Sequence, residues 1–133
     1  MTPIRTQLYK KSYGFELLRI AQGDLESACA LQEVGKGRRE NIGYLAQQCI
    51  EKSIKSVLCF RMVPVPHSHE LSALITLLSK DLAFPYGLEI SDLSHFASIR
   101  RYMEGSYELD DEEILVAIEV AKNVYQWAIG IVK

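Results

Sequence analysis

The chain has 133 residues, of which 48% are hydrophobic and 24% are charged, as expected for one globular domain with its own core. The formal net charge of −2 argues against a protein that coats nucleic acid through overall positive charge, although a local basic patch remains compatible with it. Cys29, Cys49 and Cys59 cannot all pair and form no CxxC motif, so free thiols in a reducing compartment are expected. The sequence shows no apolar signal core and no uncharged membrane-spanning run, and it therefore predicts a cytoplasmic protein.

The N-terminal half predicts an arm followed by two long helices. Residues 1–14 are expected to be an N-terminal arm, and residues 15–133 a single helical domain. Helical periodicity begins at Phe15, and Gly35 is expected to end this first helix. A second helix is predicted over residues 40–60.

The C-terminal half predicts three more helices. Pro64 and Pro66 interrupt the pattern, and Ser68 is a suitable N-cap for a third helix. Ser91 can cap a fourth helix whose apolar face continues to Met103. Asp110 and Glu113 have the spacing of a capping box for a last helix over residues 111–132. No segment shows the alternation of a β-strand, so five helices in an antiparallel bundle are expected.

The last helix carries two apolar stripes. One stripe consists of Ile114, Ile118, Ala121 and Tyr125, and the other consists of Val116, Val120, Trp127 and Ile131. One stripe is enough for a helix at the edge of a bundle. The second stripe indicates either a central helix or a subunit contact, and the sequence does not separate these two interpretations.

The polar side of the second helix is the first candidate for a binding site. At 100° per residue, Gln48, Glu51, Lys52 and Lys55 lie within about 100° of one another. Two amines, an amide and a carboxylate together could hold a phosphate or a ribose. The alternative is a solvated helix face on which Glu51 and Lys55 form an i,i+4 pair worth about 0.3 kcal/mol.

Two further groups of residues could carry chemistry. Arg100 and Arg101, next to Tyr102, would form an anion site if they lay near the lysines of the second helix, or else extend over the core into solvent. His67 and His69 form an HxH pair, but no further ligand has a recognisable spacing, so no metal site is predicted. Phosphate-loop, dinucleotide-binding and nucleophile-elbow motifs are absent from the sequence.

These motifs together resemble the HEPN family of helical nucleotide-binding domains. The resemblance rests on QQCIEKSIKSVL over residues 47–58, on His69-Glu70-Leu71 after a proline-containing loop, and on Arg101-Tyr102. It covers about residues 15–132 and implies an all-α, four- to five-helix up-and-down bundle. It also implies a homodimer, often paired with a minimal nucleotidyltransferase. Many members of the family are metal-independent RNases that use an Arg and a His four to six residues apart.

The sequence departs from that family pattern at the RNase motif. Met103 replaces the proline of the Arg-Tyr-Pro turn, and no histidine follows Arg100 or Arg101 at a short distance. The sequence therefore favours a non-catalytic protein that binds a nucleotide, an RNA phosphate or a protein partner within a toxin–antitoxin-like pair. It requires no cofactor. The expected ligand-binding residues are Gln48, Glu51, Lys52, Lys55, His69, Arg100, Arg101 and Tyr102.

Two other functions remain open at this point. The first is an RNase toxin in which Arg101 stabilises phosphorane charge and His69 transfers protons. The second is a purely structural dimerisation module, with its interface at Val116, Val120, Trp127 and Ile131.

Overall fold

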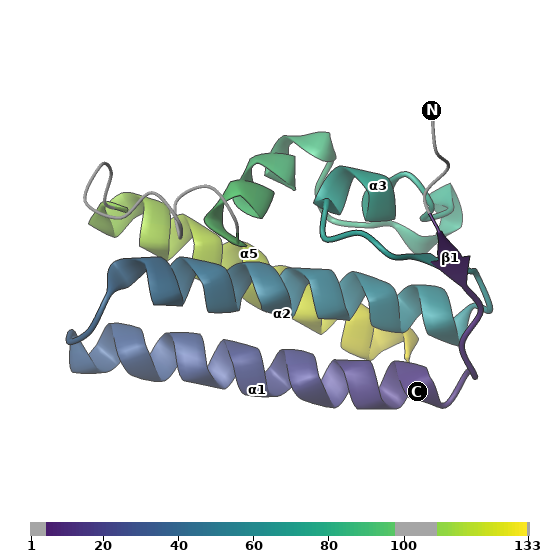
Figure 1. The fold of residues 1–133 in the computed structure, drawn as a ribbon, viewed down its shortest axis with the longest axis horizontal. Coiled ribbons are helices and arrows are strands. Elements are labelled where there is room, and N and C mark those ends of the chain that lie inside the picture. Colours follow the sequence, from purple (N-terminus) through teal and green to yellow (C-terminus); the bar gives the residue numbers. More distant parts are fainter. Residues whose placement is uncertain (1–4, 98–108, 133) are drawn as a thin grey trace.

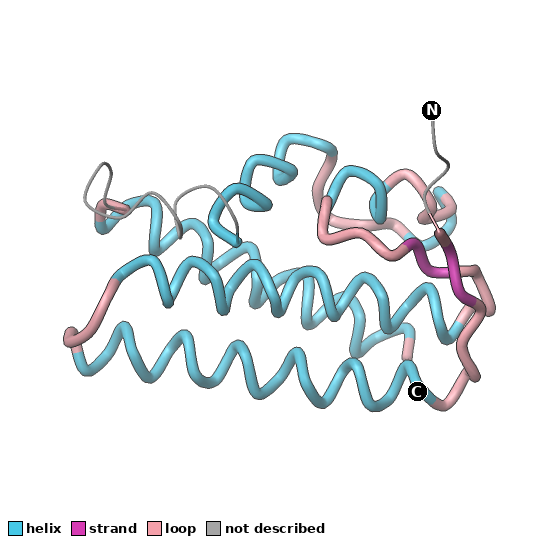
Figure 2. The backbone as a smooth tube through the Cα atoms, viewed as in Figure 1, coloured by secondary structure: helices cyan, strands magenta, loops and turns pink. Residues whose placement is uncertain are grey.

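The computed structural model describes residues 5–97 and 109–132, and three long helices dominate it (Figure 1). Helices α1 (Tyr13–Val34) and α2 (Arg39–Phe60) lie antiparallel, side by side. Helix α5 (Asp111–Ile131) packs against α2 and runs in the same direction as α2. The described residues after α2, 61–97, return along the bundle (Figure 2). The predicted all-α bundle is therefore confirmed.

Glycines determine how α1 meets α2. Gly35 ends α1 in the left-handed conformation, with φ of 71°, and its N–H donates to the Leu31 carbonyl at 3.1 Å, as predicted. Gly14 lies in the first turn of α1, where a Cβ atom would come within 2.8 Å of the Ser56 carbonyl oxygen. A side chain would not fit there, so Gly14 lets the start of α1 approach the end of α2 closely.

Helix α2 is the centre of the molecule. It packs against α1, α3, α5 and the 3-10 helix η2 (Leu88–Ala97). Its fully buried apolar residues include Cys49, Ile50, Ile54 and Val57. A helix covered on several sides needs apolar residues over most of its circumference, and α2 has them.

Helix α5 begins with the predicted capping box. The Asp110 carboxylate accepts from the Glu113 N–H at 2.8 Å, and the Glu113 side chain accepts from the Asp110 N–H at 3.2 Å. Within the described residues, α5 is the one helix long and apolar enough to cross a membrane by length and composition. Its packing against α2 accounts for this apolar character within a bundle.

The segment between α2 and α5 differs from the sequence prediction. Helix α3 (Leu71–Ile75) has only five residues, and its N-cap is Glu70 rather than Ser68. The Ser68 hydroxyl instead accepts from the Glu70 N–H at 3.1 Å and shapes the preceding loop. The next elements are 3-10 helices, η1 (Lys80–Leu82) and η2, where the sequence predicted an α-helix from Ser91. Apolar residues three apart share one face in both helix types, so spacing alone did not distinguish them.

The expectation of a wholly strand-free chain was wrong at the N-terminal arm. Strand β1 (Thr6–Gln7) pairs antiparallel with β2 (Val65–Pro66), and the His67 N–H donates to the Arg5 carbonyl at 2.7 Å. Two-residue strands are too short to show an alternating pattern. This pairing holds the arm against the loop that follows α2.

Candidate functional site

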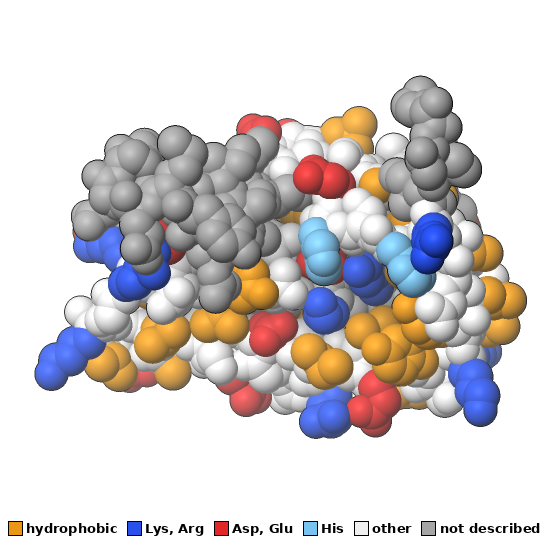
Figure 3. Space-filling model, in the orientation of Figure 1, with side chains coloured by type: hydrophobic (Ala, Val, Ile, Leu, Met, Phe, Trp, Pro, Cys, Tyr) orange, Lys and Arg blue, Asp and Glu red, His pale blue; other side chains and the backbone are white. Residues whose placement is uncertain are grey.

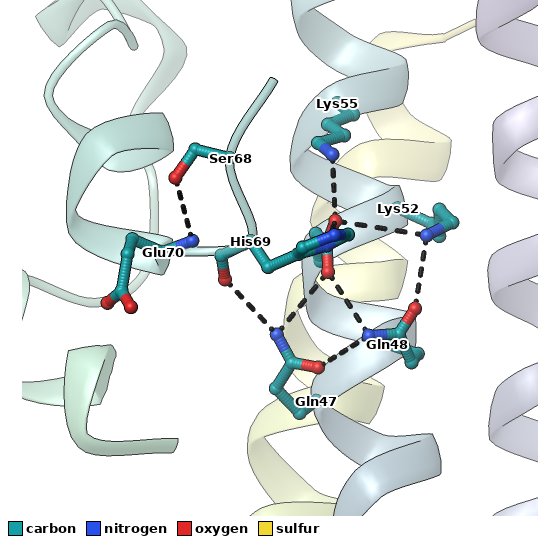
Figure 4. A network of polar contacts seen from close by, with 8 residues as sticks. Gln47, Gln48, Lys52, Lys55, Ser68, His69 and Glu70 are labelled. Carbon is teal, nitrogen blue, oxygen red and sulfur yellow. Dashed lines mark hydrogen bonds and ion pairs between the residues drawn. The ribbon is translucent and has the colours of Figure 1, made fainter. Parts of the chain in front are cut away.

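The carboxylate of Glu51 lies at the centre of a polar network that includes most of the predicted ligand-binding residues. Figure 4 labels Gln48, Lys52, Lys55 and His69 among the members of this network. The Glu51 side chain is fully buried. One oxygen accepts from Lys55 Nζ at 2.7 Å and from His69 Nδ1 at 2.9 Å, with Lys52 Nζ 3.8 Å away. The other oxygen accepts from the amides of Gln48 at 3.2 Å and Gln47 at 3.4 Å. Four donors on one buried carboxylate are the arrangement that an ionised group requires.

The charge state of Glu51 follows from these partners. Burial raises the pKa of this carboxyl, since it removes water from the charged form. The hydrogen bond from Lys55, the charges of Lys52 and Lys55 and the hydrogen bond from His69 act in the opposite direction and prevail, so the pKa lies below its ordinary value. Glu51 is therefore ionised at neutral pH.

His69 is oriented by this carboxylate. An ionised carboxylate can only accept, so Nδ1 of His69 carries the hydrogen, and in the neutral ring Nε2 is left as an acceptor. The His69 side chain is 77% exposed, whereas those of Lys52 and Lys55 are 22% and 14% exposed. The network thus holds one imidazole at the surface beside two half-buried ammonium groups.

A cleft opens beside this network, between α2, the start of α1, the N-terminal arm and the loop after α2. Its volume is about 320 Å³. We call it the Lys52–His69 cleft, and its walls consist of Tyr9, Tyr13, Leu17, Lys52, Lys55, Val65, Pro66, His67, Ser68 and His69. Figure 3 shows basic and histidine side chains gathered on this face of the molecule. Among the residues that the structure describes, the lining includes no Asp or Glu, although the whole chain is net acidic.

A second cavity of similar size has the opposite character. It has a volume of about 330 Å³ and lies at the start of α5. Leu93 and Val116 line it together with Asp110, Glu112 and Glu113. Three carboxyl groups repel a phosphate, so the Lys52–His69 cleft is the better anion site of the two.

The polar side of α2 is not the solvated face that the sequence left as an alternative. Glu51 and Gln47 are buried there, and Gln48 is half-buried. The loop carrying His69 covers this side of the helix, which the linear sequence does not reveal. Arg100, Arg101 and Tyr102 lie outside the described residues, so their predicted place in the site stays a prediction.

Several residues of the site did not stand out in the sequence. Gln47 donates to Glu51 and to the His69 carbonyl, and so ties the loop to α2. Tyr9 and Tyr13 line the cleft from the arm and the first residue of α1. Asp24 on α1 interacts electrostatically with both Lys52 and Glu51. The two tyrosines are four residues apart, a spacing that brings side chains together on a helix. Tyr9 lies in a segment without helical periodicity, however, so the sequence did not predict that the two rings meet.

The predicted interface residues of α5 have different environments. Val120 is buried in the core of this chain. Trp127 is half-buried, and its ring centroid lies 4.9 Å from that of Phe84. The Nε1 of Trp127 donates to the Leu82 carbonyl at 2.8 Å. Ile131 is half-buried beside the end of the core. Val116 is 50% exposed. Packing within one chain thus accounts for most of the second apolar stripe.

The cysteines and histidines do not form a metal site among the described residues. No three His, Cys, Asp or Glu side chains gather within that part of the chain. All three cysteines are free, as predicted. Burial raises the pKa of Cys49 to about 12 and that of Cys59 to about 11, so neither thiol is a nucleophile at neutral pH.

Comparison with known proteins identifies the family. The sequence profile of the HEPN domain matches residues 16–132, and the chain therefore belongs to the HEPN domain family. Its fold is similar to the crystal structure of an archaeal HEPN homologue, with a TM-score of 0.69 and 23% sequence identity over 95% of this chain and 100% of that one. Comparison with curated proteins gives no match.

Proposed function

We propose that this HEPN protein binds the phosphate of a nucleotide or of RNA in the Lys52–His69 cleft, without cleaving it. The main support is the pair of ammonium groups, Lys52 and Lys55, held at the wall of a cleft whose described lining has no acidic residue. The buried carboxylate of Glu51 orients them from behind, and Gln48 accepts from Lys52 Nζ at 3.1 Å. Oriented, half-buried amines lose little further entropy when an anion binds.

The test is thermal unfolding with and without ATP, GTP, CTP, UTP or a short RNA. A ligand at 100 times its Kd adds about 2.7 kcal/mol, which raises Tm by roughly 8 °C for a domain of this size. The variant Lys52→Gln/Lys55→Gln should lose this shift, because its amides can still donate to Glu51 but carry no charge. The control Lys36→Ala/Lys122→Ala changes the net charge equally at exposed sites and should keep the shift. Equal shifts in both variants would refute the proposal.

A second function, RNA cleavage, is favoured by the Glu51–His69 pair. Nε2 of His69 could take the proton of a ribose 2′-hydroxyl as its oxygen attacks the neighbouring phosphorus. The bond to the 5′-oxygen then breaks, and that oxygen takes a proton from water. In this function Arg101 would stabilise the phosphorane charge. Overproduction of the wild type should then stop growth and degrade RNA, and His69→Ala should abolish both effects. Normal growth and intact RNA with the wild type would exclude this function.

We further propose that the protein acts in the cytoplasm beside a minimal nucleotidyltransferase, as the family resemblance implies. A nucleotidyltransferase encoded next to this protein should co-purify with it from cells that produce both. Separate elution of the two proteins at micromolar concentration would refute the pairing.

We also propose a homodimer through α5, supported by the exposed Leu115 and Val116. Val116→Glu is the variant to test, because Trp127→Glu would break contacts inside one chain. The native mass of the wild type should be that of two chains, and Val116→Glu should halve it. An unchanged native mass in Val116→Glu would show that the interface does not include Val116.

A further inference from the structure

The Lys52–His69 cleft has an aromatic side as well as a cationic one. Tyr9 and Tyr13 form a stacked pair, with ring centroids 4.9 Å apart and ring planes 27° from parallel. Both rings line the cleft, together with the apolar residues Leu17, Val65 and Pro66. The lysines of α2 belong to the same cleft. A ligand that uses the whole cleft therefore combines an anionic group with a flat aromatic one.

The aromatic pair is held in place before any ligand binds. The β1–β2 pairing anchors the arm on one side of Tyr9. On the other side, Lys11 Nζ lies 4.4 Å from the centroid of the Phe60 ring. Gly14, next to Tyr13, allows close contact between α1 and α2. Tyr13 nevertheless stays 39% exposed, so part of its ring remains open to a ligand.

We propose that the Tyr9–Tyr13 pair is the platform on which a nucleobase stacks while its phosphate binds Lys52 and Lys55, so that the ligand of the cleft is a single nucleoside monophosphate unit. This inference rests on the phosphate site proposed above and adds the identity of the rest of the ligand. Bases stack readily on tyrosine rings, and stacking tolerates any base because every base has a π-face.

Charge and size both favour one nucleotide with one phosphate. Lys52 and Lys55 carry two positive charges and Glu51 one negative charge, which leaves +1 within the network, and the negative charge of Asp24 on α1 reduces this balance further. A phosphate monoester carries about −1.5 to −2 at pH 7. A cleft of about 320 Å³ is at the lower end of the range for small-molecule sites. Further phosphates therefore find neither space nor compensating charge here, and ATP should bind no more tightly than AMP.

Calorimetric titration with inorganic phosphate, ribose 5-phosphate, AMP and UMP tests the inference. Base stacking should make both nucleotides bind about 5- to 150-fold more tightly than ribose 5-phosphate. Tyr13→Ala should remove this gain and leave ribose 5-phosphate binding unchanged, which also shows that the cleft is folded. Tyr13→Phe, the matched control, should keep the gain because stacking needs the ring and not the hydroxyl. Tyr9→Ala should reduce the affinity gain of the two nucleotides over ribose 5-phosphate, because Tyr13 loses the ring on which it stacks.

The outcomes separate this inference from the proposed function. If ribose 5-phosphate and AMP bind equally well, the base platform is refuted while the phosphate site stands. If neither phosphate nor any nucleotide binds, both proposals fail. Short single-stranded RNAs with a 5′-phosphate or a 5′-hydroxyl distinguish the source of the nucleotide. If the RNA with a 5′-phosphate binds as tightly as AMP, the natural ligand is the 5′ end of an RNA chain. If AMP binds and neither RNA does, the ligand is a free mononucleotide.

Discussion

The two sides of α2 are equally hidden from solvent but are built from opposite kinds of residue. Ala46 and Cys49 on one side and Glu51 and Gln47 on the other all have an exposed fraction of 1% or less. The apolar side needs only close packing, since apolar surface is stabilised by removal from water. The polar side needs a donor or acceptor for every buried group, because an unpaired one costs about 1–3 kcal/mol.

This difference indicates what each side is for. A buried ion pair is often no more stabilising than well-packed apolar residues of similar volume, so stability alone does not require Glu51 and its lysines. The arrangement does fix two amines and an imidazole beside the Lys52–His69 cleft. The apolar side of α2 therefore supports the fold, and the polar side supports the site. Substitutions on each side should separate these two roles.

The largest effect on stability is expected on the apolar side. Ile42→Ala removes a buried side chain on the side of α2 opposite Glu51 and should lower the free energy of unfolding by about 2–5 kcal/mol. Chemical denaturation measures this change, and Ile20→Ala, at a position 38% exposed, is the matched control with an expected change near 0.5 kcal/mol. Phosphate affinity should stay at the wild-type value wherever the variant is folded. A loss of affinity in folded Ile42→Ala would contradict the separation of roles.

A smaller effect on stability, with a large effect on binding, is expected on the polar side. Glu51→Gln keeps the shape but removes the charge that Lys55 and His69 contact, and should cost about 1–3 kcal/mol at pH 7. It should also abolish phosphate binding, because the amines lose their orientation. Chemical denaturation and calorimetric titration measure the two effects. Unchanged affinity in Glu51→Gln would show that the network does not support the cleft.

The same variant has a defined pH dependence. The pKa of Glu51 in the folded chain lies below the ordinary value of 4.5, so the ionised carboxylate stabilises the fold. That contribution is complete above about pH 4.5 and is lost as the pH falls through the folded value. The stability difference between wild type and Glu51→Gln should therefore shrink below pH 4.5. A constant difference down to pH 2 would contradict this assignment.

The sequence predicted the apolar side of α2 better than the polar side. Helical periodicity, Gly35 and the Asp110–Glu113 capping box identified the long helices, because each is a local signal along the chain. The residues of α2 that meet in the site were also grouped correctly by their spacing. What the sequence did not reveal was that a loop covers them.

The remaining features depend on contacts between distant segments. His69 contacts Glu51 across 18 residues, and β1 pairs with β2 across nearly half the chain. The 3-10 helix η2 shares its apolar spacing with an α-helix. No local pattern determines such features, since they form only once α1, α2 and the loop after α2 are packed together.

The smallest effect is expected at Asp24, which faces the polar side of α2 from α1. Burial is the main reason that its pKa lies above the usual 3.8, and Glu51 adds to the shift while Lys52 opposes it. The ionised form of Asp24 is therefore slightly destabilising at neutral pH, and this penalty disappears as the pH falls below 3.8. Asp24→Asn should raise the free energy of unfolding at pH 7 by about 0.5 kcal/mol or less, since the residue is partly exposed to solvent.

Asp24→Asn also tests whether charge limits binding in the Lys52–His69 cleft. Removing a negative charge near Lys52 leaves that amine freer to attract phosphate. Because the charge is nearby and partly exposed to solvent, the affinity for phosphate should rise only a few-fold at low salt. The gain should fade as ionic strength shortens the screening length to about 8 Å at 0.15 M. A lower affinity in Asp24→Asn would instead mean that Asp24 orients Lys52, and the polar side of α2 would then extend its network into α1.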